Sequence, residues 1–67
     1  MIALTVNGQL RQFEGPLQVP ALLQELELTG KRIALERNGE IVPRGRFSDV
    51  WLADGDKIEI VVAVGGG

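Results

Sequence analysis

The chemistry open to this 67-residue chain is limited first by the side chains that it lacks. It contains no histidine and no cysteine, and Ser48 is its only serine. A Ser-His-Asp or Cys-His arrangement for nucleophilic catalysis therefore cannot be built from it. Asp54 and Asp56 are closely spaced carboxylates, but Asp-Gly-Asp between two hydrophobic segments is typical of a turn. No spacing matches a calcium loop, so we expect neither a catalytic residue nor a metal site.

The remaining candidate lies in the last stretch, VVAVGGG, where a hydrophobic segment leads into Gly65, Gly66 and Gly67. Glycine loses the most backbone entropy on ordering, and chain ends fray unless they are held. The three glycines therefore contribute little stability. They are not a phosphate-binding loop, because no helix follows to receive an anion. Either this end has no function, or the terminal carboxylate of Gly67 is the working group.

Two hairpins and a final strand are the elements that must position this end. Asn7-Gly8 and Asn38-Gly39 each favour a type I′ turn, because these residues readily adopt positive φ. Alternating apolar and polar residues on both sides of the turns predict strands. The last strand has the longest signal and begins after the Asp54-Gly55-Asp56 turn. The predicted strands cover residues 2–6, 10–14, 33–37, 40–42 and 57–64.

One amphipathic helix is predicted between the hairpins, in VPALLQELEL (residues 19–28). Its apolar residues recur at spacings of three and four and so form one face. We expect the helix to stop at Thr29-Gly30, with Gly30 in the left-handed conformation that follows many helices. Residues 44–53 have no clean period and predict an irregular loop. We expect Trp51, within this loop, to be core or partly buried rather than a partner anchor.

A helix cannot bury its apolar face alone, so it must cross one face of the sheet. The order β-β-α-β-β-β within 64 residues is that of a β-grasp domain. We therefore predict an α+β fold in which one main helix packs across a mixed sheet of about five strands. The predicted domain covers residues 1–64, and residues 65–67 form a flexible C-terminal glycine tail.

Composition and charge exclude several classes of function. The net charge is −2, with acids and bases interspersed, whereas nucleic-acid modules usually carry a basic stripe. The first ten residues do not have the pattern of a signal peptide. No apolar run approaches the roughly 20 residues that span a bilayer. We expect a cytoplasmic protein that binds neither nucleic acid nor membrane.

Three motifs together resemble the ThiS family, the bacterial sulfur carriers of thiamin biosynthesis. They are NGEIVPR (residues 38–44), DGDKIEIV (residues 54–61) and the final VGGG. Each is common alone, but their spacing and their position against the last glycine match the family along the whole chain. The resemblance implies a ubiquitin-like β-grasp fold.

The resemblance also implies a mechanism and partners. In the family, a ThiF-like, E1-like enzyme uses ATP to adenylate the terminal glycine carboxylate, and a transient acyl-adenylate forms. A sulfur donor such as a cysteine desulfurase then provides the sulfur of a thiocarboxylate, which passes to thiazole synthase. Carried over to this chain, the sulfur-carrying residue is Gly67, and Gly65 and Gly66 enter the active sites of the partners. The chain itself is then a carrier and not an enzyme, with no permanently bound cofactor.

The strand before the glycines offers a docking surface. If Ile58, Ile60 and Val62 face the helix, Val61 and Ala63 lie on the open face of the sheet. Contiguous exposed apolar residues mark interaction sites. We therefore predict that Val61, Ala63 and Val64 contact partners, although valine also simply favours strands.

Three alternatives remain open at this point. The small subunit of molybdopterin synthase is also ubiquitin-like and ends in Gly-Gly, although it is usually longer. A ubiquitin-like modifier would join its terminal glycine to lysines of other proteins. A plain binding module would make the glycine end incidental.

Overall fold

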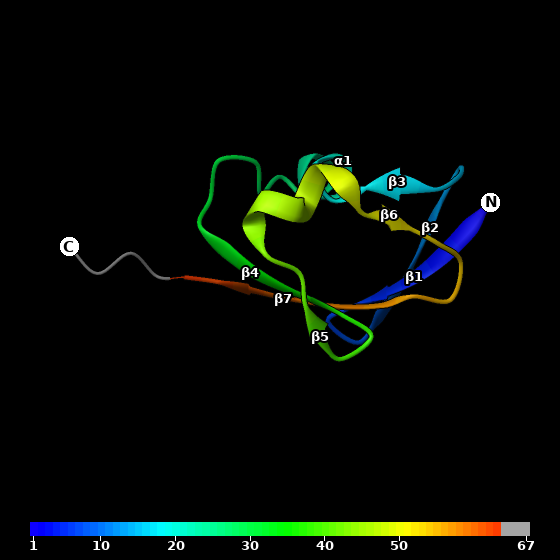
Figure 1. Ribbon diagram of the computed structural model, residues 1–67. Helices are drawn as coiled ribbons and strands as arrows, with labels where there is room; N and C mark the ends of the chain where they lie inside the picture. The colour runs from blue at the N-terminus through cyan, green and yellow to red at the C-terminus, as the bar shows by residue number, and fades with distance from the viewer. Residues whose placement is uncertain (64–67) are drawn as a thin grey trace.

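Five strands form one mixed sheet in the computed structural model, which describes residues 1–63 (Figure 1). The strand order is β2-β1-β7-β4-β5. Strands β1 and β7 are parallel, and the other neighbours are antiparallel. The bounds are β1 Ile2–Val6, β2 Gln9–Phe13, β4 Ile33–Arg37, β5 Glu40–Ile41 and β7 Lys57–Val62. The predicted mixed sheet of about five strands is confirmed, with the last strand beside the first.

Both predicted hairpin turns are present. Asn7 and Gly8 have φ values of 50° and 82°, and Asn38 and Gly39 have 52° and 86°. Two successive positive φ values are the requirement of a type I′ turn, whose twist matches that of the flanking strands. The turns therefore set the register of β1 against β2 and of β4 against β5.

Helix α1 (Val19–Glu25) lies across one face of the sheet, together with the 3₁₀ helix η1 (Arg44–Asp49) (Figure 1). The helix is shorter than predicted. Leu26 is its C-cap residue, and Glu27 takes the left-handed conformation with φ 59°. The predicted stop at Thr29-Gly30 was wrong, because Glu27 adopts the terminating conformation three residues earlier. Gly30 also has positive φ, at 83°, but in the connection to β4.

A second, two-stranded sheet on the helix side was not predicted. It pairs β3 (Leu17–Gln18) with β6 (Trp51–Leu52), antiparallel. The pairing attaches the 44–53 segment to the start of α1 and buries Leu52. Trp51 points the other way and is 57% exposed, so the expectation that it is core or partly buried was wrong. Alternation along a strand explains the result, because Leu52 takes the inner position.

The core lies between the sheet and the layer formed by α1 and η1. Strands β1, β7 and β4 contribute alternate residues, and the helix contributes the face that its sequence predicted. The buried hydrophobic residues are Ile2, Leu4, Val6, Val19, Leu22, Leu23, Ile33, Leu35, Phe47, Leu52, Ile58 and Ile60. Within residues 1–63, no helix is long and apolar enough to cross a membrane.

Candidate functional site: the end of strand β7

Strand β7 carries the chain through the centre of the sheet toward its last residues (Figure 1). On one side it pairs with β4 along its length, from Arg37 opposite Ile58 to Ile33 opposite Val62. The Ala63 amide then donates to the Arg32 carbonyl at 2.8 Å. The strand is therefore held by backbone hydrogen bonds as far as the last residue that the structure describes.

Val61 lies on the face of the sheet away from α1 and is 66% exposed; Ala63 is also exposed. Their expected exposure is confirmed. Leu10 and Ile41 are exposed on the same face, since their register partners Thr5 and Glu36 alternate with core residues. This open face therefore carries apolar side chains on three of its strands. Whether Val61 and Ala63 contact a partner remains a prediction.

Val62 does not share the burial of Ile58 and Ile60, although it follows them on the same face of β7. It is 41% exposed, whereas Ile58 and Ile60 are buried. Val62 lies on the helix side of the sheet, as expected, but it stays exposed because α1 ends at Glu25 and does not extend over the end of the strand. Val62 lines an open groove instead.

This groove is bounded by the end of β7, the start of β2 and the segment that follows α1, and measures about 270 Å³. Its apolar part is formed by Val6, Leu26, Leu28, Ile60 and Val62. The remaining lining residues are Asn7, Gln9 and Arg11. Arg11 is the one charged side chain among them.

The side chain of Asn7 takes the place of a strand beside β7. Strand β1 pairs with β7 only at Lys57 and Ile58, because the chain turns at Asn7. Beyond that point, the Asn7 side-chain amide nitrogen donates to the Ile60 carbonyl at 3.1 Å, and its oxygen accepts from the Ile60 amide at 2.7 Å. One asparagine thus satisfies both backbone groups of Ile60. The sequence indicated only the turn at this position.

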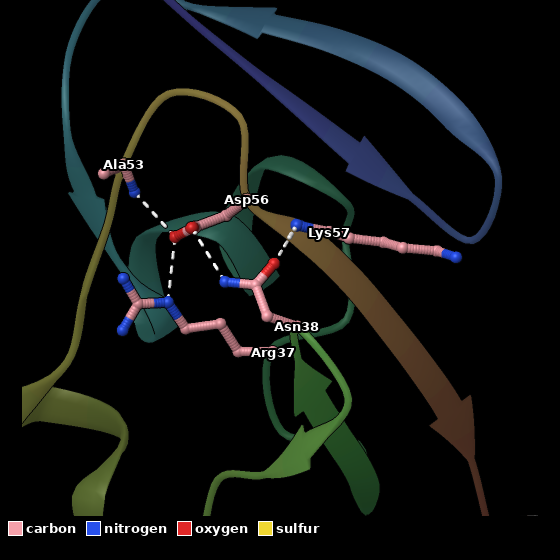
Figure 2. A network of polar contacts seen from close by, with 5 residues as sticks. All are labelled: Arg37, Asn38, Ala53, Asp56 and Lys57. Carbon is pink, nitrogen blue, oxygen red and sulfur yellow. Dashed lines mark hydrogen bonds and ion pairs between the residues drawn. The ribbon is translucent and has the colours of Figure 1, made fainter.

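Asp56, directly before β7, is joined by hydrogen bonds to the β4–β5 turn and to Ala53 (Figure 2). Its carboxylate accepts hydrogen bonds from Arg37 Nε at 2.8 Å, Asn38 Nδ2 at 3.0 Å and the Ala53 amide at 2.9 Å. Asn38 Oδ1 in turn accepts from the Lys57 amide at 2.8 Å. These contacts join the β4–β5 turn to the connection between β6 and β7. The group has a structural role, which agrees with the turn predicted at residues 54–56.

Burial raises the pKa of the Asp56 carboxyl, but other contributions outweigh it. Hydrogen bonds from Ala53, Asn38 and Arg37, and the positive charge of Arg37, stabilise the ionised form. The resulting pKa lies below the ordinary aspartate value. A carboxylate held ionised by three donors is a poor general acid or base at neutral pH.

Only two of the predicted site residues, Val61 and Ala63, lie within the part of the chain that the structure describes. Val61 and Ala63 lie side by side along the open face at the end of β7. Val64, Gly65, Gly66 and Gly67 lie outside the described residues, as does the predicted boundary between domain and tail. Within residues 1–63, no group of three or more acidic side chains is arranged to hold a metal ion.

Comparison with known proteins identifies the family. A model of the ThiS family matches residues 4–67. The sulfur carrier protein ThiS of Bacillus subtilis is 48% identical over 46 residues, which cover 69% of this chain and 70% of that protein. The crystal structure of the thiamine biosynthesis protein ThiS from Geobacter metallireducens superposes with a TM-score of 0.83 at 35% identity. That match covers 98% of this chain and all of the other.

A thiazole synthase from Paramagnetospirillum magneticum contains a segment similar to almost the whole chain. The two are 47% identical over 64 residues, which cover 96% of this chain and 20% of the synthase. The chain thus spans about a fifth of the length of this relative. A domain similar to this chain is therefore part of the polypeptide of that thiazole synthase.

Proposed function

Because the chain belongs to the ThiS family, we propose that it is a sulfur carrier protein for thiazole formation in thiamin biosynthesis. The observation that carries the proposal is the family match from residue 4 to residue 67, which includes the glycine end. The similarity to the ThiS proteins of Bacillus subtilis and Geobacter metallireducens supports it over most of the chain.

The working group in this proposal is the carboxylate of Gly67. A carboxylate is a poor electrophile, because its charge is shared by both oxygens. Attack of one oxygen on the α-phosphorus of ATP releases pyrophosphate and gives an acyl-adenylate. The terminal sulfur of a donor persulfide then attacks the carbonyl carbon, and AMP leaves. A thiol reduces the resulting acyl disulfide by two electrons and releases the donor thiol. The product is a thiocarboxylate, whose sulfur thiazole synthase accepts.

In this proposal, the folded domain holds the Gly67 carboxylate at a distance from its own surface. The β4 ladder holds β7 as far as Ala63. Three extended residues span at most about 10–11 Å, and glycine adds no side-chain bulk. Gly65, Gly66 and Gly67 are therefore suited to a narrow channel while the sheet docks outside. Val61 and Ala63, exposed beside that point, provide apolar area for docking.

Catalysis belongs to the partners in this proposal. They are a ThiF-like adenylating enzyme, a sulfur donor such as a cysteine desulfurase, and thiazole synthase. The chain lacks histidine and cysteine, and the Asp56 carboxylate is engaged by three donors. A chain without thiols also offers no side chain that would compete for activated sulfur or for the acyl group.

Reconstitution tests the proposal. The protein is incubated with the adenylating enzyme, ATP, the sulfur donor and a thiol reductant, and then with thiazole synthase and its other substrates. We expect a C-terminal thiocarboxylate by intact mass, followed by thiazole product. Sulfur transfer to a molybdopterin synthase large subunit but not to thiazole synthase would refute the assignment to thiamin. Conjugates to lysines without thiocarboxylate would indicate a modifier instead.

A further inference from the structure

One edge of β7 is left without a strand partner near its end, within the described residues. The backbone groups of Asp56 and Ile58 face β1 and accept hydrogen bonds from the Thr5 and Asn7 amides at 3.0 and 2.9 Å. Those of Ile60 face the same side and are satisfied by the Asn7 side chain. Since direction alternates along a strand, the N–H and C=O of Val62 also face this side. Within residues 1–63, neither β1 nor Asn7 pairs with Val62.

The Asn7 side chain also limits where another strand can pair. It occupies the edge at Ile60 with both a donor and an acceptor. An incoming extended segment therefore has its first pairing position at Val62, next to the residues that lead to Gly67. Unpaired strand edges that proteins do not blunt are templates for another chain.

The groove beside this edge has the chemistry to receive a side chain of such a segment. Leu26, Leu28 and Val62 give it apolar walls, and about 270 Å³ is room for one large hydrophobic side chain. Arg11 gives its rim a positive charge, although the protein as a whole has a net charge of −2. The complementary segment is extended, inserts an apolar residue and carries a carboxylate close to it.

On these grounds, and resting on the proposed function, we propose that an extended segment of thiazole synthase pairs with the free edge of β7 at Val62. Its apolar side chain enters the groove, and its carboxylate meets Arg11. The Paramagnetospirillum magneticum relative supports this choice of partner, because there a domain of this kind and a thiazole synthase share one polypeptide. Recognition by strand addition obtains affinity from main-chain hydrogen bonds and specificity from the pocket beside them.

Val62→Pro tests the main-chain contact. Proline removes the Val62 N–H that faces the free edge. Strand edges tolerate proline at positions where the N–H makes no hydrogen bond within the sheet. We expect Val62→Pro to bind purified thiazole synthase about tenfold more weakly than wild type in calorimetry, since a backbone hydrogen bond is lost and pairing is blocked. Val62→Thr, which keeps the N–H, should bind within about threefold of wild type. Equal binding by the proline and threonine variants would overturn the proposal.

Amide hydrogen exchange of the wild-type protein provides a test that does not depend on a variant folding. The Val62 amide should exchange rapidly in the free protein and at least about tenfold more slowly in the complex with thiazole synthase. The Val61 amide, which faces β4, is the internal control and should change little. Unchanged exchange at Val62 in a saturated complex would refute strand addition. Slowing in the absence of synthase, rising with protein concentration, would assign the edge to a second copy of the chain and also refute it.

Charge reversal tests the groove. Arg11→Glu should weaken synthase binding more than Arg44→Glu, a matched charge change on η1, away from the groove. Equal effects would show that only net charge matters and would contradict the role of Arg11. Thiocarboxylate formation with the adenylating enzyme, ATP, the sulfur donor and a thiol reductant is measured in parallel on wild type. If wild type forms no thiocarboxylate, the proposed function fails. If it forms thiocarboxylate and the Val62 and Arg11 tests are negative, only the edge contact fails.

Discussion

Replacing Asp56 by alanine should remove a large part of the stability of this fold. The residue is 8% exposed, and three donors point at its carboxylate from 2.8 to 3.0 Å. Hydrogen bonds to a charged group contribute about 1.5–3 kcal/mol each before solvation of the freed donors. The Arg37 side chain is 34% exposed and regains water, which reduces its share. We expect a net loss of about 2–4 kcal/mol in the free energy of unfolding.

Urea denaturation, followed by Trp51 fluorescence and circular dichroism, measures this loss. A single core in so small a domain rarely supplies more than about 3–5 kcal/mol, so Asp56→Ala should be close to unfolded at room temperature. Asp56→Asn keeps one acceptor oxygen and should lose about half as much. Asp49→Asn is the control, because Asp49 meets Arg46 at 3.6 Å with both side chains about two-thirds exposed. It should change stability by less than about 0.5 kcal/mol.

The same urea midpoint and slope for Asp56→Ala and Asp49→Asn would refute this prediction. That result would mean that water replaces the carboxylate with no loss in the free energy of unfolding. The hydrogen bonds between Asp56 and the β4–β5 turn would then not stabilise the fold. A lower midpoint for Asp56→Ala with an unchanged slope would confirm that the native state alone has been weakened.

Three further predictions concern the pH dependence of Asp56, the pairing of Asn7 with Ile60, and the two faces of the sheet. Since the pKa of Asp56 is lowered by folding, its contribution is complete above the unfolded pKa and is lost as pH falls from about 5 through the folded pKa; the urea midpoint of Asp56→Asn should therefore fall less over that range than that of wild type. Asn7→Gly keeps the turn but removes the amide pairing, so exchange of the Ile60 amide should accelerate at least about tenfold, and unchanged exchange would show that the pairing does not protect it. Leu35→Ala, in the core, should cost about 2–4 kcal/mol, whereas Leu10→Ala on the open face should cost less than about 0.5 kcal/mol; similar losses in urea would contradict the assigned faces.

The sequence predicted those parts of the fold that depend on local chemistry. Asn7-Gly8 and Asn38-Gly39 specify their turns through the conformations that they favour, and the turns align strands whose apolar alternation is strong. The leucine spacing from Val19 identified the helix and its buried face. These features need no knowledge of residues distant in the chain.

The errors lie where tertiary contacts decide. A two-residue strand such as β6 has no measurable period, and it pairs with β3 residues that lie 33 and 35 positions away in the chain. The outward position of Trp51 therefore could not be predicted. The helix ends at Glu25, and Glu27 takes the left-handed conformation that follows it, although glutamate is unfavourable there. The Leu28 amide donates to the Leu23 carbonyl at 2.7 Å and closes the helix end.

The candidate site divides in the same way. Exposure of Val61 follows from alternation and was predicted. The exposure of Val62 depends on how far α1 reaches, and the amide bridge from Asn7 joins residues more than fifty positions apart. The sequence carried little signal for the contact of Asn7 with Ile60. An asparagine at the first turn position is compatible with the turn alone and also with a side chain that donates and accepts hydrogen bonds.

The most direct test of the central claim is the intact mass of the protein after incubation with the adenylating enzyme, ATP, a sulfur donor and a thiol reductant. We expect a gain equal to the replacement of one oxygen by sulfur, located by fragmentation at Gly67 and dependent on ATP. We expect no gain for a folded variant that lacks Gly66 and Gly67. A gain located at any other residue, or one that persists after those glycines are deleted, would contradict the claim that Gly67 carries the sulfur.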